Sequence, residues 1–180
     1  MRVIAGNLRG LKLSAPQGTS TRPTLDRVKE AVFSMLTPHL CDASVLDIFA
    51  GSGAMGIEAL SRGARSCVFV ENNRNAAECI KNNLISAKLT NDISLLVEDA
   101  FLFLKKTIEK FDLIFLDPPY ASNFYSDSLR LIKQNDVLSE NGLIVAEWDY
   151  DFGFTSDLDG FTIIKNKKYG RVGITVLKRG

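Results

Sequence analysis

The chain has 180 residues, of which 46% are apolar, and this suits one globular domain with a sizeable core at a net charge of +1. No apolar run approaches the roughly 18 residues of a membrane span, and the amino-terminal residues lack the apolar segment of a signal peptide. One histidine and three cysteines without a Cys-x-x-Cys pair exclude a His-based triad and argue against metal sites and disulfides, so we expect a cytoplasmic, reduced protein.

Charge is distributed unevenly along the chain. Residues 1–40 carry +4 and residues 161–180 carry +6, whereas the residues between them carry −9. Basic ends on an acidic body predict a polyanionic partner held beside the core. For charge alone, a solvated surface is the simpler explanation.

The amino-terminal residues predict a small β-hairpin followed by a helix. Short strands over Arg2–Gly6 and Leu11–Ser14 flank a plausible turn. After a polar loop, apolar residues at helical spacing predict a helix that begins near Thr24, a suitable N-cap, and stops at Pro38.

After residue 40, strands and helices alternate, as expected for a parallel sheet with right-handed crossovers. The predicted strands are Ser44–Phe49, Cys67–Glu71, Ile93–Val97, Phe111–Asp117, Leu143–Trp148, Phe161–Lys167 and Val172–Lys178. The predicted helices are Ala54–Arg62, Asn73–Lys88, Phe101–Thr107 and Ser122–Gln134. No helix separates the last two strands, so they form an antiparallel hairpin at one edge. We therefore divide the chain into an extension, 1–40, and one α/β unit, 41–180.

The first predicted strand leads into a glycine-rich loop that opens the next helix. Glycines at such a position permit a tight turn and close approach of the backbone to a ligand. Gly51-x-Gly53-x-x-Gly56 matches the dinucleotide fingerprint, and Glu71 stands where a ribose-binding acid would follow. A nicotinamide or flavin enzyme is therefore one hypothesis, and a purely structural turn is the simplest alternative.

Asp47 favours a different cofactor. A carboxylate at the end of this strand would repel a pyrophosphate, but it suits the ammonium group of S-adenosylmethionine (SAM). Gly51 and Gly53 would then give backbone access, Glu71 would accept hydrogen bonds from ribose hydroxyls, and Asp99 would accept from the adenine amino group. Each acid could instead cap a helix, and this alternative is strongest for Asp99.

The sequence Asp117-Pro118-Pro119-Tyr120 follows the fourth predicted strand at the same edge of the sheet. Two prolines end the strand and make a stiff corner. An exocyclic amino group on a base is a poor nucleophile, and Asp117 with the Pro118 carbonyl could accept its hydrogens and direct its lone pair at a methyl donor. Tyr120 offers a face on which an extruded base could stack.

These motifs resemble those of the amino-group methyltransferases, and the amino-terminal residues narrow the resemblance. Three segments resemble the RsmD family of bacterial small-subunit ribosomal RNA guanine-N2 methyltransferases: Arg2-Val3-Ile4-Ala5-Gly6, Arg9-Gly10-x-Lys12-Leu13 and Arg22-Pro23-Thr24-x-x-Arg27. The resemblance covers nearly the whole chain. It is loosest after Leu143.

The resemblance implies a Rossmann-like class I SAM-dependent methyltransferase fold, with a seven-stranded, mostly parallel sheet. It implies a guanine of 16S rRNA as target, in a partly assembled or complete 30S subunit, and we expect a monomer. The expected catalytic residues are Asp117, Pro118 and Tyr120. The expected cofactor residues are Asp47, Phe49, Gly51, Gly53, Glu71, Asn72, Asp99, Ala100 and Asp117. The expected RNA-binding residues are Arg2, Arg9, Lys12, Arg22, Arg27, Lys168 and Arg171.

Three other functions stay open at this point. The motif Asp117-Pro118-Pro119-Tyr120 serves any exocyclic amine, so the enzyme could act on another base or another RNA. A nucleotide-dependent oxidoreductase rests on the glycine loop alone. A non-catalytic RNA-binding or assembly module would not need the intact motif.

Overall fold

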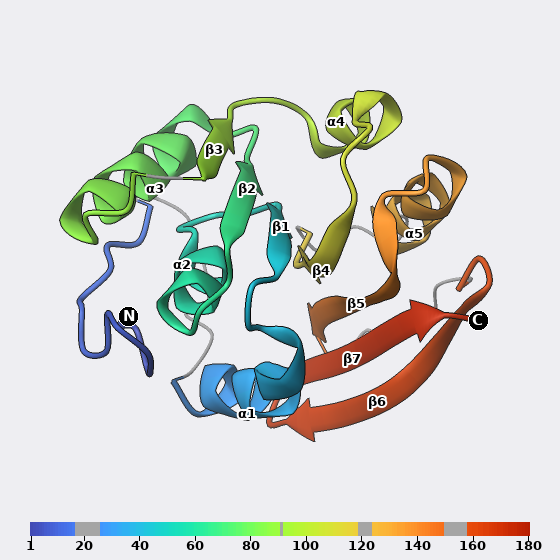
Figure 1. Cartoon of the computed structure of the whole chain (residues 1–180), viewed down its shortest axis with the longest axis horizontal. Helices are drawn as coiled ribbons and strands as arrows, with labels where there is room; N and C mark the ends of the chain where they lie inside the picture. Colours follow the sequence, from blue (N-terminus) through green and yellow to red (C-terminus); the bar gives the residue numbers. More distant parts are fainter. Residues whose placement is uncertain (17–25, 91, 119–123, 150–157) are drawn as a thin grey trace.

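A computed structural model describes residues 1–16, 26–90, 92–118, 124–149 and 158–180 (Figure 1). These residues build one seven-stranded sheet, with β3 at one edge and β6 at the other. Among the described helices, none has the length and apolarity needed to cross a bilayer.

The sheet has the order β3-β2-β1-β4-β5-β7-β6. Its strands are β1 (Ser44–Ile48), β2 (Ser66–Val70), β3 (Ile93–Leu96), β4 (Phe111–Leu116), β5 (Leu138–Asp149), β6 (Phe161–Tyr169) and β7 (Val172–Arg179). The first five strands pair in parallel, and β7 is antiparallel to both β5 and β6. The predicted mostly parallel sheet with a terminal antiparallel hairpin is confirmed.

Helices cover both faces of the sheet because the buried strands are apolar on both sides. The helical segments are α1 (Asp26–Leu36), the 3-10 turn η1 (Thr37–His39), α2 (Ala54–Ser61), α3 (Arg74–Ser86), α4 (Ala100–Lys106) and α5 (Phe124–Gln134). Helices α1, α2 and α3 pack with one set of alternating strand residues, which includes Val45 and Phe115. Helices α4 and α5 pack with the other set, which includes Leu46 and Ile114. This alternation is the period of two that strands impose.

Two predictions differ from the structure by more than two residues. Strand β5 begins at Leu138 rather than Leu143, and a register shift between Phe111 and Leu113 accommodates the additional residues. The predicted amino-terminal strands reduce to one antiparallel bridge between Arg2 and Lys12. The proposed N-cap Thr24 lies outside the described residues.

Strand order reverses between β1 and β4, and this reversal determines where a ligand can bind. The chain leaves β1 towards β2 and leaves β4 towards β5, so the connecting loops diverge on either side of the junction. In open α/β sheets the crevice at such a point, at the carboxyl ends of the strands, is the usual ligand site.

A buried carboxylate holds the amino-terminal residues against this core. Glu58 in α2 is fully buried and accepts hydrogen bonds from the backbone N–H groups of Ile4 (2.8 Å) and Ala5 (3.0 Å). It also forms ion pairs with Lys29 Nζ of α1 (3.0 Å) and Arg62 Nε (2.8 Å). One side chain therefore joins the hairpin, α1 and α2.

Substitution of Glu58 by alanine should leave the buried ammonium group of Lys29 without its ion-pair partner. We expect a loss of roughly 3–5 kcal/mol in the free energy of unfolding, as for other broken buried pairs. The matched control is Glu78→Ala, which removes an exposed Glu–Lys pair on α3 and should cost less than about 0.5 kcal/mol. Urea unfolding of both variants provides the measurement, and equal losses would contradict the role assigned to Glu58.

Candidate active site at the carboxyl ends of β1, β4 and β5

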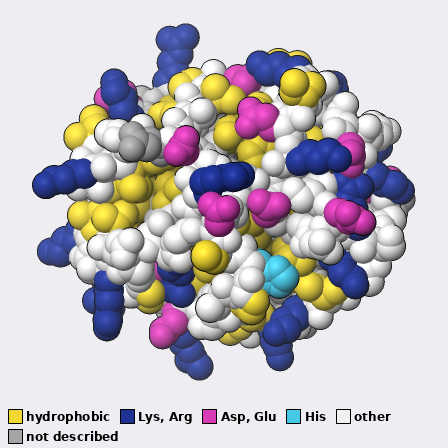
Figure 2. Space-filling view, in the orientation of Figure 1, with side chains coloured by type: hydrophobic (Ala, Val, Ile, Leu, Met, Phe, Trp, Pro, Cys, Tyr) yellow, Lys and Arg dark blue, Asp and Glu magenta, His cyan; other side chains and the backbone are white. Residues whose placement is uncertain are grey.

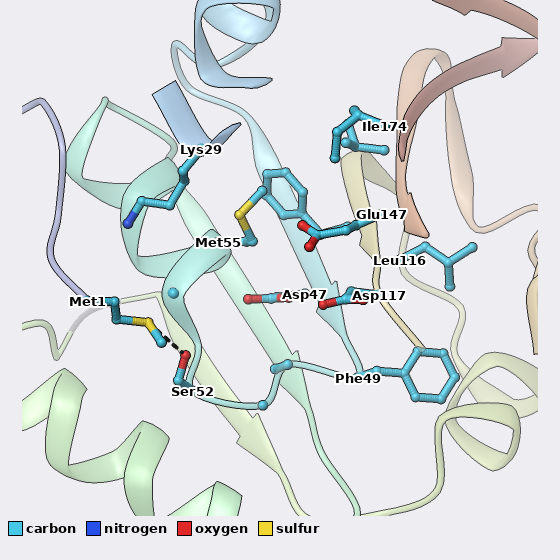
Figure 3. A pocket seen from close by; sticks show the side chains of 15 residues that line it. Met1, Lys29, Asp47, Phe49, Ser52, Met55, Leu116, Asp117, Glu147 and Ile174 are labelled. Atoms are coloured by element: carbon cyan, nitrogen blue, oxygen red, sulfur yellow. Dashed lines mark hydrogen bonds between the residues drawn. The ribbon is translucent and has the colours of Figure 1, made fainter. Parts of the chain in front are cut away.

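A pocket opens where β1, β4 and β5 end, at the predicted crevice (Figure 3). Three acidic side chains line it, one from each strand or strand end: Asp47, Asp117 and Glu147. Its other lining residues are Met1, Lys29, Phe49, Ala50, Gly51, Ser52, Ala54, Met55, Phe115, Leu116, Val145 and Ile174.

Strand register explains why the three acids meet. Asp47 is paired with Phe115 across β1 and β4, so both side chains point to the same face. Leu116 is paired with Ala146 in the parallel β4–β5 ladder, so the next residues, Asp117 and Glu147, lie side by side at the strand ends. The side chains of Asp47, Asp117 and Glu147 line the same part of the pocket in Figure 3.

Asp47 is the most deeply buried of the three. Its side chain is 4% exposed, and its Oδ2 accepts a hydrogen bond from the Gly56 N–H of α2 at 2.8 Å. Burial raises the pKa of Asp47 to about 7, against a smaller lowering by that hydrogen bond and a further raising by Glu71. A cation bound beside Asp47 would therefore favour its ionised form, and the proton would pass to solvent.

Asp117 is also perturbed, although it is more accessible. Desolvation by the surrounding protein raises the pKa of Asp117 well above its usual range, and the negative charges of Glu147 and Asp47 raise it further. The residue remains exposed at the mouth of the pocket, so water offsets part of the desolvation. Repulsion between adjacent carboxylates is the cause that the geometry supports directly.

The glycine loop adopts the conformation that glycine permits. Gly51 and Gly53 have positive φ angles of 57° and 73°. Glu71, at the end of β2, accepts hydrogen bonds from the Gly51 N–H and the Asn73 N–H, both at 2.8 Å. The predicted ribose acid thus also fixes the loop, and each of its oxygens retains lone pairs for a further donor.

Gly56, the third glycine of the fingerprint, serves packing instead. A Cβ atom at Gly56 would lie 2.4 Å from Phe69 Cε1 and 2.7 Å from Cys67 Sγ in β2. Helix α2 can therefore approach the sheet only with glycine at this position, and its amino terminus is held over the pocket.

Asp99 forms a helix cap. Its Oδ1 accepts hydrogen bonds from the N–H groups of Phe101 (2.9 Å) and Leu102 (3.0 Å) at the start of α4. Phe101 also forms an aromatic cluster with Phe49 and Phe124, with ring centroids 5.4 to 6.1 Å apart. The capping alternative for Asp99 is therefore present in the structure, and its Oδ2 is not used by these cap bonds.

The other predicted cofactor and catalytic residues do not line this pocket or lie outside the described part of the chain. Asn72 is exposed and Ala100 is buried at the start of α4, and neither lines the pocket. Pro118 is buried directly after Asp117. Tyr120 lies outside the described residues.

The predicted RNA-binding residues are mostly exposed. Arg2 forms a 2.8 Å ion pair with Asp26, and Arg9, Lys12, Arg27 and Arg171 are exposed. Arg22 lies outside the described residues. Lys168 is exposed and is paired in register with Gly173, on the face of the sheet opposite to Ile174 and the pocket.

Sequence reasoning missed several pocket residues, of which Glu147 and Lys29 carry charge. Glu147 is 9% exposed within the otherwise apolar end of β5, and an acid in a buried strand is the signal that could have revealed it. Lys29 is 2% exposed, and its Nζ donates to the Arg2 carbonyl at 2.6 Å in addition to its pair with Glu58. Within the described residues, no group of three or more His, Cys, Asp or Glu side chains could hold a metal ion.

Comparisons with known proteins agree with this architecture. The sequence model of the family described as "Conserved hypothetical protein 95" matches residues 1–178. YlbH of Bacillus subtilis (strain 168) is 40% identical over 182 residues, covering 99% of each chain. The "Ribosomal RNA small subunit methyltransferase D" of Haemophilus influenzae is 37% identical over 96% of this chain and 90% of its own. The solved structure of yhhF from Escherichia coli is 31% identical, covers 99% of this chain and 97% of that chain, and has a TM-score of 0.89.

The raised pKa of Asp47 predicts a pH-dependent cost of folding. Because its pKa is about 7 in the folded protein and near 3.8 when exposed, the folded state binds the proton more tightly. The contribution of Asp47 to stability should be greatest below pH ~4 and should be lost as pH rises through ~7, by up to roughly 4 kcal/mol.

The isosteric variant Asp47→Asn cannot titrate and should lack this contribution. The free energy of unfolding of both proteins is measured in urea at each pH from ~4.5 to ~8.5. As pH rises, the variant should become more stable relative to the unmodified protein. Parallel stability curves for the two proteins would show that Asp47 does not titrate in this window.

Proposed function

The chain belongs to the Conserved hypothetical protein 95 family, which is the RsmD family that its amino-terminal motifs resemble. From this family membership we propose that the protein transfers a methyl group from SAM to the exocyclic N2 amino group of a guanine in 16S rRNA. The observation that carries the proposal is the convergence of Asp47 and Asp117 on one pocket beside the Gly51–Gly53 loop. The same family membership supports the assignment of the substrate to small-subunit rRNA, since a relative of 37% identity is named for that activity.

The donor set of the pocket fits SAM better than a dinucleotide. Asp47 lies at the floor, where a carboxylate would repel a pyrophosphate but attract an ammonium or a sulfonium group. A positive group beside Asp47 would also favour its ionised form and so offset the cost of burying the carboxylate. When bound, SAM supplies a methyl group on a positively charged sulfur.

The remaining cofactor residues have roles that match their contacts. The backbone of Gly51 and Gly53 has no Cβ atom to obstruct a ligand that lies across the loop. Glu71 would accept hydrogen bonds from ribose hydroxyls while it keeps the loop in place. Asp99 would offer Oδ2 to the adenine amino group, with Asn72 and Ala100 beside the same part of the cofactor.

Asp117 would act on the acceptor nitrogen. Together with the Pro118 carbonyl, it would accept the two amino hydrogens, which turns the nitrogen lone pair towards the methyl donor. As the nitrogen–carbon bond forms, the amino group must release a proton, and the raised pKa of Asp117 means that its carboxylate can hold that proton. Tyr120 would stack on the base.

The basic segments would bind the RNA backbone around the pocket. In the view of Figure 2, most Lys and Arg side chains stand at the rim of the molecule, and several Asp and Glu side chains lie nearer the middle. Strand β6 is exposed from Thr162 to Lys168 and carries three lysines. Lys167 is paired with Ile174, and Ile174 with Glu147, so Lys167 lies on the pocket face two strands from the acid.

An oxidoreductase that binds a dinucleotide at the glycine loop is the second hypothesis, and cofactor binding separates the two. Calorimetry with SAM, NAD(H) and NADP(H) should show binding of SAM. Binding of a dinucleotide without binding of SAM would overturn the proposed function.

Replacing Asp117 by alanine should abolish most methyl transfer and leave SAM affinity nearly unchanged. Although Asp117 is also among the predicted cofactor residues, its main role in the proposal is at the acceptor nitrogen, so we expect a loss of at least about 100-fold in single-turnover rate. The measurement is labelled-methyl transfer to 30S particles from a strain that lacks the enzyme. The control Asp127→Ala removes an exposed carboxylate that pairs with Arg130, and should retain the full rate.

Lys167 and its neighbour on β6 provide a matched test of the RNA surface. Lys167→Ala should weaken binding to unmodified 30S particles and lower the slope of log affinity against log salt by about 1, because one phosphate contact is lost. Lys168→Ala, on the opposite face, should have a smaller effect. Equal effects of the two substitutions on affinity would place the RNA elsewhere.

A further inference from the structure

Glu147 lines the candidate active site, yet none of the roles above uses its side chain. It lies in β5 between Ala146 and Trp148 and is 9% exposed. Figure 3 shows its two oxygens turned towards the space between Asp47 and Asp117.

The sheet holds Glu147 and Asp117 in a fixed relation. Leu116 and Ala146 are register partners in the parallel ladder, so Asp117 and Glu147 are the next residues of adjacent strands, whose backbones are ~4.8 Å apart. Tyr125 of α5 donates a hydrogen bond from its hydroxyl to the backbone carbonyl of Glu147, which restrains the end of β5. Two carboxylates therefore stand side by side on a rigid support.

An ionised carboxylate can accept hydrogen bonds but cannot donate them. The three bases that carry an exocyclic amine differ at the ring nitrogen beside it. In guanine one of the two ring nitrogens beside the N2 amino group, N1, carries a hydrogen. In adenine and cytosine the neighbouring ring nitrogen is an acceptor, which would face a carboxylate with a lone pair.

We propose that Glu147 accepts a hydrogen bond from N1–H of the target guanine while Asp117 accepts from its N2 amino group, so that Glu147 is the residue that determines specificity for guanine. This inference rests on the proposed function. It names a residue that reads the Watson–Crick edge of an extruded base, the mode by which enzymes that act on extruded bases recognise them. Discrimination by one such contact is about 10- to 100-fold.

The substitution Glu147→Gln tests this role with a matched pair of substrates. 2-Aminopurine keeps the 2-amino group of guanine but has an acceptor at N1. The side-chain amide of the variant can accept from N1–H or donate to an unprotonated N1, whereas the Glu147 carboxylate can only accept. The substitution should therefore lower the preference for guanosine over 2-aminopurine riboside by at least about tenfold. The intrinsic reactivities of the two bases cancel in this comparison.

The substrates are small subunits reconstituted on rRNA that carries one or the other nucleoside at the methylated position, introduced by splinted ligation. Single-turnover methyl transfer gives the ratio of rates, and competition binding gives a second ratio that does not require turnover. Glu140→Gln is the control, because Glu140 lies on the same strand but is exposed and outside the pocket. It should keep the original preference in both assays.

The pH profile supplies a readout that a purely structural role would not change. Removal of the Glu147 charge removes one cause of the raised pKa of Asp117, so the acidic limb of the rate profile should move to lower pH in Glu147→Gln.

The outcomes separate the inference from the function on which it rests. If the unmodified enzyme methylates guanine and Glu147→Gln retains its preference in both assays, the role of Glu147 is wrong and the proposed function stands. If the unmodified enzyme binds SAM but does not methylate guanine, the proposed function fails and this inference fails with it.

Discussion

The repulsion between like charges at the ends of β1, β4 and β5 is the constraint on which the site depends. Strand register places three acidic residues around one pocket: Asp47, Asp117 and Glu147. Burial and repulsion from neighbouring carboxylates make the ionised forms of Asp47 and Asp117 unfavourable in the free protein. A ligand that brings a cation and N–H donors would relieve this cost. The fixed positions of these carboxylates in the sheet therefore favour such ligands over anionic ones.

A second set of contacts makes the amino-terminal residues part of the same site. The Glu58 cluster fixes the hairpin against α2 and brings Met1 to the pocket, where the Ser52 hydroxyl lies 3.3 Å from the Met1 sulfur. Lys29 belongs both to the contacts around Glu58 and to the pocket, since its ammonium group pairs with Glu58 and its side chain lines the pocket. The basic hairpin is thus held at a fixed position relative to the acids, as its proposed role in RNA binding requires.

The strands and the glycine loop could be predicted from the sequence because their signals are local. Apolar runs such as Phe111–Leu116 give strands within a residue or two of those observed. The start of β5 could not be predicted, since Ser139-Glu140-Asn141-Gly142 has the composition of a turn. These four residues fall in the register shift between β4 and β5, and Leu138 before them pairs with Phe111.

The site was predictable only in part, for a different physical reason. Helix caps and ligand acids look alike in a sequence, because both are acids between a strand and a helix. Asp99, which the sequence predicts as an adenine-binding acid, caps α4 in the structure. Glu147 belongs to no spaced motif, and its importance comes from a neighbouring strand about thirty residues earlier in the chain.

The order in which the strands are synthesised has a consequence for the formation of the pocket. Strand β6 pairs only with β7 in this sheet, and β7 also closes against β5 and supplies Ile174 to the pocket wall. A nascent chain that has reached residue 171 therefore contains every acid of the pocket but lacks one of its walls, so the site is completed only when synthesis passes β7.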